Sequence, residues 1–404
     1  MLINCLRCAV HNLPPDQWIA DVDWAVLLRQ ARGHSVESYL FPWLCQHLPD
    51  QFSSHAAVPE DSPQAAWRSF ALKQLGVTIK RQKQAADILS AFAENSIQVT
   101  PLKGIWLSEQ IYDEPSQRKM VDIDLLVKTD DKEKAGAILT KLKYTSRRAM
   151  LESEYMSDLS FYHPAYELFV ELHWNVESRM NENRGIPDIS TILQRTESTE
   201  LLGKPVKCFP IEDQLCNLTQ HILHHQLALP LKGYIDIALL LNQEKLNIRK
   251  LKLDESAADW KTGRAVPFML KLVAELFELK GIPDELTATT FNSELIQETV
   301  NAVLKLPPAS SRTREINLLK YKQATTTEKL KLIRKRIFMP QSFMQMHYPF
   351  AENRILLPVA WFLRAVSLIE SSGKKLISAK TSAPNLANAA GRARIIEQLT
   401  GKEN

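Results

Sequence analysis

"LKGIWLSEQIYDEPSQRKMVDIDLLV", residues 102–127, is the stretch that decides the fold, because a helical pattern gives way there to a strand that carries two aspartates. The alternation in "MVDIDLLV" predicts that Asp122 and Asp124 share one strand face while Val121, Ile123 and Leu125 fill the other. An unpaired buried carboxylate is strongly destabilising, so these aspartates require a cation or a ring of hydrogen-bond donors. Burial alone does not account for them.

Two carboxylates on one strand face can converge on a cation between them. Same-face neighbours in a strand lie about 6.5 to 7 Å apart, and hard oxygen ligands suit Mg²⁺ or Mn²⁺. A second strand-like run, "FVELHW", places Glu171 and His173 together on one face. We predict that Glu171 is a third metal ligand or the base that accepts a proton from an attacking hydroxyl. His173 either orients a substrate or forms a hydrogen bond within the site.

The lysine and glycine that precede the aspartates predict an anion site. Lys103 and Gly104 fall where a strand leads into a helix, so helix N-terminal amides and an ammonium can meet a triphosphate there. Arg118, four residues before Asp122, could clamp a phosphate or pair with the aspartates.

The segments around this stretch predict an α+β fold. Extended, helical and alternating runs follow one another over residues 96–177 and end in a predicted hairpin, which together describe a small mixed sheet with helices against it. Apolar residues recur at helical spacing on both sides of this core. We therefore expect an N-terminal helical domain over 1–95, a helical domain over 178–300 that completes the cleft, and a C-terminal helical extension over 301–404 with a mobile polar tail after Lys380.

Composition limits the compartment and the partners. The chain has 404 residues, which predicts two or three domains, and its net charge of +4 neither requires nor excludes nucleic acid. Five scattered cysteines and the lack of an export-type leader predict a cytoplasmic protein with reduced thiols. No apolar run reaches the roughly 18 to 20 residues that span a bilayer. We expect no transmembrane segment and no peripheral membrane contact.

Three further groups have a functional and a structural interpretation. Lys232 and Asp236 lie one helical turn apart, so they either line the cleft and contact a nucleotide or form a salt bridge along the helix. The triplet His221, His224 and His225 has spacing that could bind zinc, although helix packing beside the cleft is the favoured interpretation.

The basic run at 329–336 could bind RNA through its clustered cations, whereas most such runs are solvated helix faces. Its cationic members are Lys329, Lys331, Arg334, Lys335 and Arg336.

The motif at 102–127 resembles the signature of the uncharacterised nucleotidyltransferase family of the DNA polymerase beta superfamily. In that family a leucine-lysine-glycine turn is followed by a tyrosine, an arginine and "DIDLLV", and the likeness continues through "VELHW" at 170–174 and "YIDIALLL" at 234–241. The sequence departs from the wider superfamily, which usually has Gly-Gly or Gly-Ser at the turn, because Ile105 follows the glycine here.

The resemblance implies a nucleotidyltransferase core flanked by helices and an NTP as substrate. Two Mg²⁺ ions would be held by Asp122, Asp124 and Glu171 while an NMP moves to a hydroxyl-type acceptor and pyrophosphate leaves. Lys103 would replace the missing serine as a phosphate contact, and Asp236 gains weight as a nucleotide-binding residue. A small molecule is the favoured acceptor. One alternative is a toxin-like enzyme that modifies tRNA or a protein, and another is an inactive binding or scaffold protein.

Overall fold

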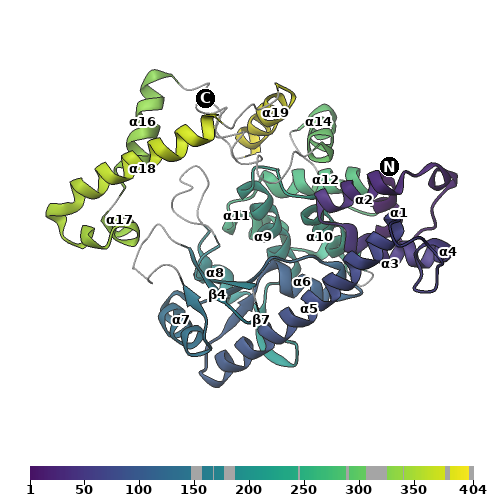
Figure 1. Cartoon of the computed structure of the whole chain (residues 1–404), viewed down its shortest axis with the longest axis horizontal. Helices are drawn as coiled ribbons and strands as arrows, with labels where there is room; N and C mark the ends of the chain where they lie inside the picture. The colour runs from purple at the N-terminus through teal and green to yellow at the C-terminus, as the bar shows by residue number, and fades with distance from the viewer. Residues whose placement is uncertain are drawn as a thin grey trace.

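A five-stranded mixed sheet carries the predicted acidic residues in a chain that is otherwise mostly helical (Figure 1). The computed structural model describes residues 1–146, 157–166, 168–176, 187–243, 246–287, 291–305, 325–339, 341–377 and 383–399. The strands are β1 (Val99–Pro101), β2 (Asp122–Val127), β3 (Thr145–Ser146), β4 (Asp158–His163) and β5 (Leu168–His173), in the order β1-β2-β5-β4-β3. The pair β2 and β5 is parallel and the other pairs are antiparallel. The predicted α+β class and the β4–β5 hairpin are confirmed.

The register of β2 against β5 brings the acidic residues to one place. Asp124 lies opposite Glu171, and Leu126 lies opposite His173. Because side chains of paired residues point to the same face of a sheet, these four side chains share one face. The sheet therefore unites two segments that lie more than forty residues apart in the chain.

The two faces of β2 belong to different hydrophobic cores. Ile123 and Leu125 pack with one core, to which Ile88 and Leu139 also belong, whereas Leu126 joins the other. The elements of the first core include α5 (Pro63–Glu94), α7 (Lys132–Lys141), β6 (Glu197–Leu201) and β7 (Lys204–Cys208). This alternation is the one predicted from "MVDIDLLV", except that Val121 precedes the strand and is exposed.

The helices before and after the sheet domain share the second core. Its elements are α1 (Leu2–Val10), α2 (Trp24–His34), α3 (Glu37–His47), α4 (Pro49–Phe52), α6 (Lys103–Gln110), α8 (Ile189–Gln194), α9 (Ile211–His224), α10 (Leu231–Leu241), α11 (Leu253–Asp259), α12 (Ala265–Phe277) and α14 (Ser293–Leu304). Arg7 joins the two chain regions directly, because its Nε donates to the carbonyl oxygen of Leu276 at 2.9 Å. The predicted segments 1–95 and 178–300 are thus packed together, and their exact boundaries stay a prediction. Short helical turns complete this region: η1 (Gln17–Asp21), η2 (Pro115–Gln117), η3 (Thr129–Asp131), η5 (Ile248–Lys250) and α13 (Asp284–Thr287).

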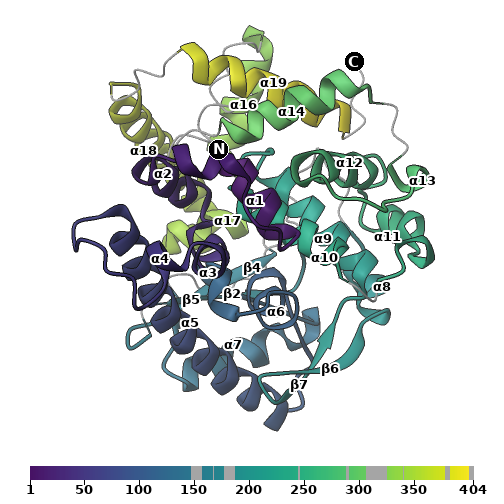
Figure 2. The ribbon, with the colours of Figure 1, turned by 90° about the vertical axis from the view of Figure 1, so that its right-hand side faces the viewer.

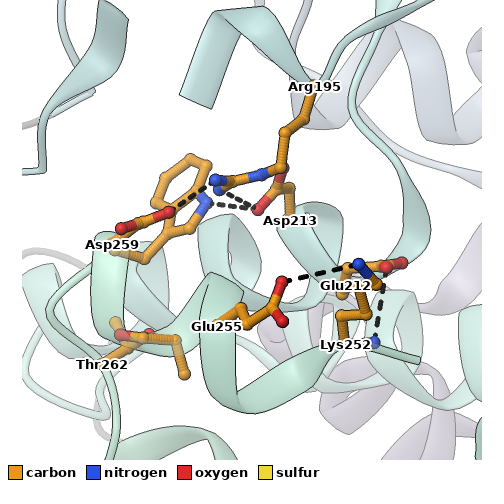
Figure 3. A network of polar contacts seen from close by, with 9 residues as sticks. Arg195, Glu212, Asp213, Lys252, Glu255, Asp259 and Thr262 are labelled. Carbon is orange, nitrogen blue, oxygen red and sulfur yellow. Dashed lines mark hydrogen bonds and ion pairs between the residues drawn. The ribbon is translucent and has the colours of Figure 1, made fainter. Parts of the chain in front are cut away.

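A buried polar network ties the end of α8 to the helices that follow (Figure 3). Arg195 donates to both carboxylate oxygens of Asp213 at 2.8 and 2.9 Å and also pairs with Asp259. The indole nitrogen of Trp260 donates to Asp213 at 2.9 Å. Asp213 is fully buried, so these donors supply the partners that a buried carboxylate requires.

A smaller core joins the helices near the C-terminus, which lie at the upper left in Figure 1. These elements are α16 (Thr326–Ile337), α17 (Gln341–His347), η6 (Pro349–Glu352), η7 (Arg354–Leu356) and α18 (Leu357–Ile377). Met344 is fully buried at the centre of this core. Of the predicted basic run, Arg334 is exposed on α16, and the side chains of Lys331, Lys335 and Arg336 lie outside what the structure describes.

The prediction of a mobile polar tail after Lys380 was wrong. Residues Ala383–Leu399 form α19, which lies beside α14 in Figure 2 and contacts it. Ile395 and Leu399, one turn apart, are buried in the second core, and Arg394 pairs with Glu298. The polar composition of this segment concealed a short apolar stripe at helical spacing, together with alanines that favour helix. No helix in the described part of the chain is long and apolar enough to cross a membrane.

Candidate active site

Asp124 is the centre of the polar group on the sheet. Its Oδ1 lies 2.9 Å from Nε2 of His173 and 3.6 Å from Nζ of Lys103. The side chain is buried, with 6% of the residue exposed. The predicted residues Asp124, Lys103 and His173 therefore meet at one carboxylate.

Asp124, Glu171 and His173 could together hold a metal ion. One possible ligand atom of each lies within 4.8 Å of the others. Nδ1 of His173 is buried and has no hydrogen-bond partner among the described residues, so this ring nitrogen is not engaged by the protein. Asp122 occupies the next same-face position along β2 but is not a member of this compact group. The donor set fits a divalent cation that accepts two carboxylates and one imidazole.

The three carboxylates respond differently to their shared environment. Burial by itself raises the pKa of Asp124, but the Lys103 ammonium and the hydrogen bond with His173 outweigh it and hold this pKa below its usual range. Burial and the charge of Asp124 raise the pKa of Glu171 to about 7. The same two causes raise the pKa of Asp122. Three acids in one low-dielectric site thus repel one another, and a bound cation would relieve that repulsion.

The lysine-glycine turn is locked to β2 by its backbone. The amide of Leu102 donates to the carbonyl of Asp124 at 3.0 Å, which places Lys103 beside the carboxylate. Lys103 has φ of 40°, a left-handed conformation that is uncommon for a residue with a side chain. Gly104 has no side chain, so Met120 and Arg118 can pack close to its backbone. A Cβ at this position would lie 3.1 Å from Sδ of Met120 and 3.2 Å from a guanidinium nitrogen of Arg118.

We expect Gly104→Ala to destabilise the protein by about 1–3 kcal/mol, the usual range for overpacking a core. Met120 can shift, but Arg118 is held in place by Asp236, so the new methyl group meets a fixed neighbour. Urea denaturation measures the effect. Gly76→Ala is the matched control: a Cβ there meets nothing within 4 Å, and alanine inside helix α5 should stabilise by about 0.5–1 kcal/mol. Equal midpoints for the two variants would contradict the close-contact explanation.

A comparison with known protein families identifies the family of the chain. Residues 20–278, more than half of the chain, match the family described as uncharacterised nucleotidyltransferase. The chain belongs to this family. No curated protein matches the sequence. Among solved structures, the antibiotic-resistance factor ANT(2'')-Ia is similar at 17% identity, with a match that covers 40% of this chain and 83% of that chain at a TM-score of 0.31.

In this family member, Arg118 and Asp236 pair with each other in the interior. Arg118 donates through Nε and a terminal nitrogen to the two oxygens of Asp236, at 2.8 and 2.7 Å. The hydroxyl of Tyr112 donates to the same carboxylate at 2.7 Å. Arg118 is 5% exposed and Asp236 is 1% exposed. Their predicted nucleotide-binding roles stay a prediction, and the structure adds a mutual bidentate pair that the sequence did not indicate.

Lys232 lies between the carboxylates and the loop that precedes them. Its Nζ donates to the carbonyl oxygen of Lys119 at 2.8 Å. Burial, followed by the charge of Arg118, lowers the pKa of Lys232 to about 8, while Asp122 acts in the opposite direction. The ammonium is therefore within the electrostatic reach of Asp122 although the two residues are not paired.

Arg81 is a polar neighbour that the sequence analysis missed. It lies on the buried face of α5 with 4% of the residue exposed, and its Nε and one terminal nitrogen have no hydrogen-bond partner among the described residues. Burial lowers its pKa to about 10, and the charge of Asp122 opposes this shift. The available signal was a run of polar residues on the inward face of α5, where Gln74 and Thr78 are also buried.

The histidine triplet does not form a metal group among the described residues. His221 and His225 are in ring contact, with centroids 4.7 Å apart. Burial lowers the pKa of His221 well below its usual value, and Lys103 adds to that effect. The neutral imidazole therefore lies on the helical side of the site, near Lys103.

Proposed function

We propose that the protein is a metal-dependent nucleotidyltransferase that moves an NMP from an NTP to a hydroxyl-type acceptor and releases pyrophosphate. The observation that carries the proposal is the compact group of Asp124, Glu171 and His173 beside Lys103, in a chain of the nucleotidyltransferase family. An enzyme of this class requires carboxylates for a cation and ammonium groups for the triphosphate.

We assign the metal to Asp124 and Glu171, with Asp122 and His173 completing the set. Bound there, Mg²⁺ or Mn²⁺ would supply positive charge that stabilises negative charge on the transferring phosphate. An imidazole ligand suits Mn²⁺ better than Mg²⁺, so the presence of His173 is a reason to assay both ions.

The cations around the acids would hold the triphosphate. Lys103 and Lys232 provide two ammonium groups whose charges act on Asp122, and Gly104 allows the turn to pack closely. We retain Arg118 and Asp236 as nucleotide-site residues, with Asp236 acting to fix the orientation of the guanidinium. Negative charge on a triphosphate is met best by cations already held in place, because little reorganisation is then required.

Glu171 is the candidate for the proton step. The acceptor hydroxyl would transfer its proton to Glu171, its oxygen would form a bond to the α-phosphorus, and the bond from that phosphorus to the leaving pyrophosphate oxygen would break. A carboxylate that binds the metal cannot also take this proton, so Glu171 acts either as a ligand or as the base, the two roles predicted from the sequence. The side chain is half-buried, with 31% exposed, so an acceptor can reach it.

The test is incubation of the purified protein with each NTP labelled at the α-phosphate, Mg²⁺ or Mn²⁺, and a fractionated lysate. We expect pyrophosphate release together with movement of the label into an acceptor fraction, only when metal is present. The fraction that gains label also distinguishes a small molecule from RNA or protein. If no NTP binds in the presence of either metal, the proposal is wrong and a scaffold role replaces it.

Lys232 should make NTP binding sensitive to pH. Below about pH 8 its side chain is a charged ammonium that attracts the triphosphate, and above that pH it becomes neutral. We expect NTP affinity to fall by about tenfold between pH 7 and 9.5, the value of one charge-assisted contact. Titration calorimetry at several pH values measures this change. Lys232→Arg keeps its charge and should show a flatter profile, and an equally steep profile in Lys232→Met would contradict the assignment.

A further inference from the structure

A hollow along helix α2 is lined by cations. Its volume is about 510 Å³, which lies within the roughly 300–1,000 Å³ typical of small-molecule sites. The residues that line this basic hollow are Ala25, Leu28, Arg29, Arg32, Gly33 and Lys119. None of the six is acidic. The basic hollow is therefore a candidate site for an anion on a small molecule.

Helix α2 builds one wall of the basic hollow through its residue spacing. Arg29 and Arg32 lie three positions apart and hence on one side of the helix, while Ala25 and Gly33 provide little bulk at either end. A Cβ at Gly33 would meet nothing within 4 Å, so the space beside this residue is open. Two cations flanked by small residues form a concave surface rather than an ordinary convex helix face.

The cations of the basic hollow are partly fixed in place. The guanidinium of Arg32 lies over the ring of Phe70, with 4.1 Å between its carbon and the ring centroid. Lys119 is held by Glu37, whose Oε1 lies 2.9 Å from the ammonium. Within the described ranges, no carboxylate pairs with Arg29 or Arg32. One acid against three cations leaves the basic hollow with positive charge that nothing described neutralises.

Lys119 and Lys232 connect the basic hollow to the segment that carries the proposed catalytic acids. Lys119 precedes Asp122 by three residues, a span of at most about 11 Å of chain. Lys232 links the two places, because its ammonium donates to the carbonyl of Lys119 and is within the influence of Asp122. Nδ1 of His34, at the end of α2, also receives the amide of Leu231 at the start of α10. Chain connectivity and one hydrogen bond therefore link the basic hollow to the strand of the proposed catalytic acids.

We propose that the basic hollow binds a phosphate group on the acceptor, so that the favoured acceptor is a small phosphorylated molecule whose hydroxyl reaches Glu171. This inference rests on the proposed function, because only an enzyme that transfers an NMP has an acceptor. Binding of a phosphate in the basic hollow can nevertheless be measured without any transfer. A group of cations that is separate from Lys103 would keep the acceptor anion apart from the triphosphate, whose charge would otherwise repel it.

The experiment measures binding of ribose 5-phosphate to the full-length protein by titration calorimetry, with ribose as the uncharged control. Arg29→Ala/Arg32→Ala should weaken ribose 5-phosphate binding by about tenfold or more, since two charged contacts are lost. Lys80→Ala/Lys83→Ala is the matched control, because it removes two exposed cations at the same spacing from α5. Gly33→Phe should block binding without any change in charge, and it protects the test against a folding defect in the double variant.

NTP binding measured on the same variants completes the test. We expect NTP affinity in the presence of metal to be unchanged in Arg29→Ala/Arg32→Ala. If NTP affinity falls as much as ribose 5-phosphate affinity, the basic hollow belongs to the nucleotide and the inference is overturned. Equal binding of ribose and ribose 5-phosphate, or tight binding of a short RNA through the same arginines without ribose 5-phosphate binding, also overturns it. Failure of the proposed function would instead appear as absent NTP binding in the wild-type protein.

Discussion

Asp124→Asn should reduce nucleotidyl transfer by about a thousandfold or more. Asp124 contacts His173 and Lys103 and belongs to the one compact group among the described residues that could hold a metal ion, so the proposed function depends on its charge. Loss of a ligand that stabilises developing charge costs several kcal/mol, and about 1.4 kcal/mol corresponds to a tenfold change in rate. The label-transfer assay with saturating NTP and metal measures the loss.

The fold should survive this substitution. Asparagine keeps the volume of the side chain and can still form a hydrogen bond with His173, while removal of one negative charge lessens the repulsion with Asp122 and Glu171. A cooperative thermal transition in circular dichroism checks the point. Asp130→Asn, which removes an exposed charge just after the same strand, is the control and should keep wild-type activity. Activity within tenfold of wild type in Asp124→Asn would refute the assignment.

Asp236→Ala should destabilise the protein by about 3–5 kcal/mol, the usual cost of breaking a buried ion pair from one side. The substitution leaves the guanidinium of Arg118 buried without its bidentate partner and removes the acceptor for the Tyr112 hydroxyl. Burial by itself lowers the pKa of Arg118, and the carboxylate of Asp236, with smaller effects from Tyr112 and Asp124, raises it above its usual value. Urea denaturation followed by tryptophan fluorescence measures the change.

A second variant separates the structural role of this pair from its proposed role in the nucleotide site. Arg118→Met/Asp236→Leu replaces both charges with apolar side chains and should recover most of the lost stability, because no buried charge is left unpaired. The Tyr112 hydroxyl still lacks its acceptor, so recovery should fall short of wild type by about 1–3 kcal/mol. If Arg118 also contacts the nucleotide, the restored protein should bind NTP more weakly than wild type. Tyr112→Phe removes one hydrogen bond and should cost about 1 kcal/mol. A double variant no more stable than Asp236→Ala would contradict the ion-pair explanation.

Local pattern was enough to predict the acidic strand. The period of two in "MVDIDLLV" placed Asp122 and Asp124 opposite Ile123 and Leu125, and the cores on the two faces of β2 confirm this division. The same rule applied to "VELHW" placed Glu171 and His173 on one face. Such periods depend only on backbone geometry within a few residues, so no knowledge of the partner strand is needed.

Contacts between distant segments could not be predicted in this way. The spacing of Lys232 and Asp236 predicted a possible salt bridge along the helix. In the structure Asp236 pairs with Arg118 instead, and Lys232 donates to the backbone of Lys119. The polar end of the chain concealed α19, because its few apolar residues matter only against α14. Which partner a side chain finds depends on how helices from both ends of the chain pack into one core.

By itself, therefore, the sequence determined the α+β class, the acidic strand, the lysine-glycine turn and the family to which the chain belongs. These features are encoded by residue spacing within single elements and by a motif of contiguous residues. Tertiary structure alone decided that the register of β2 and β5 brings Asp124 to Glu171 and His173, that Arg118 is paired with Asp236, and that α2 brings two arginines beside Lys119. The physical reason is that strand register and helix packing depend on the burial of whole faces. That burial involves contacts between segments far apart in the chain, which no short stretch of sequence specifies.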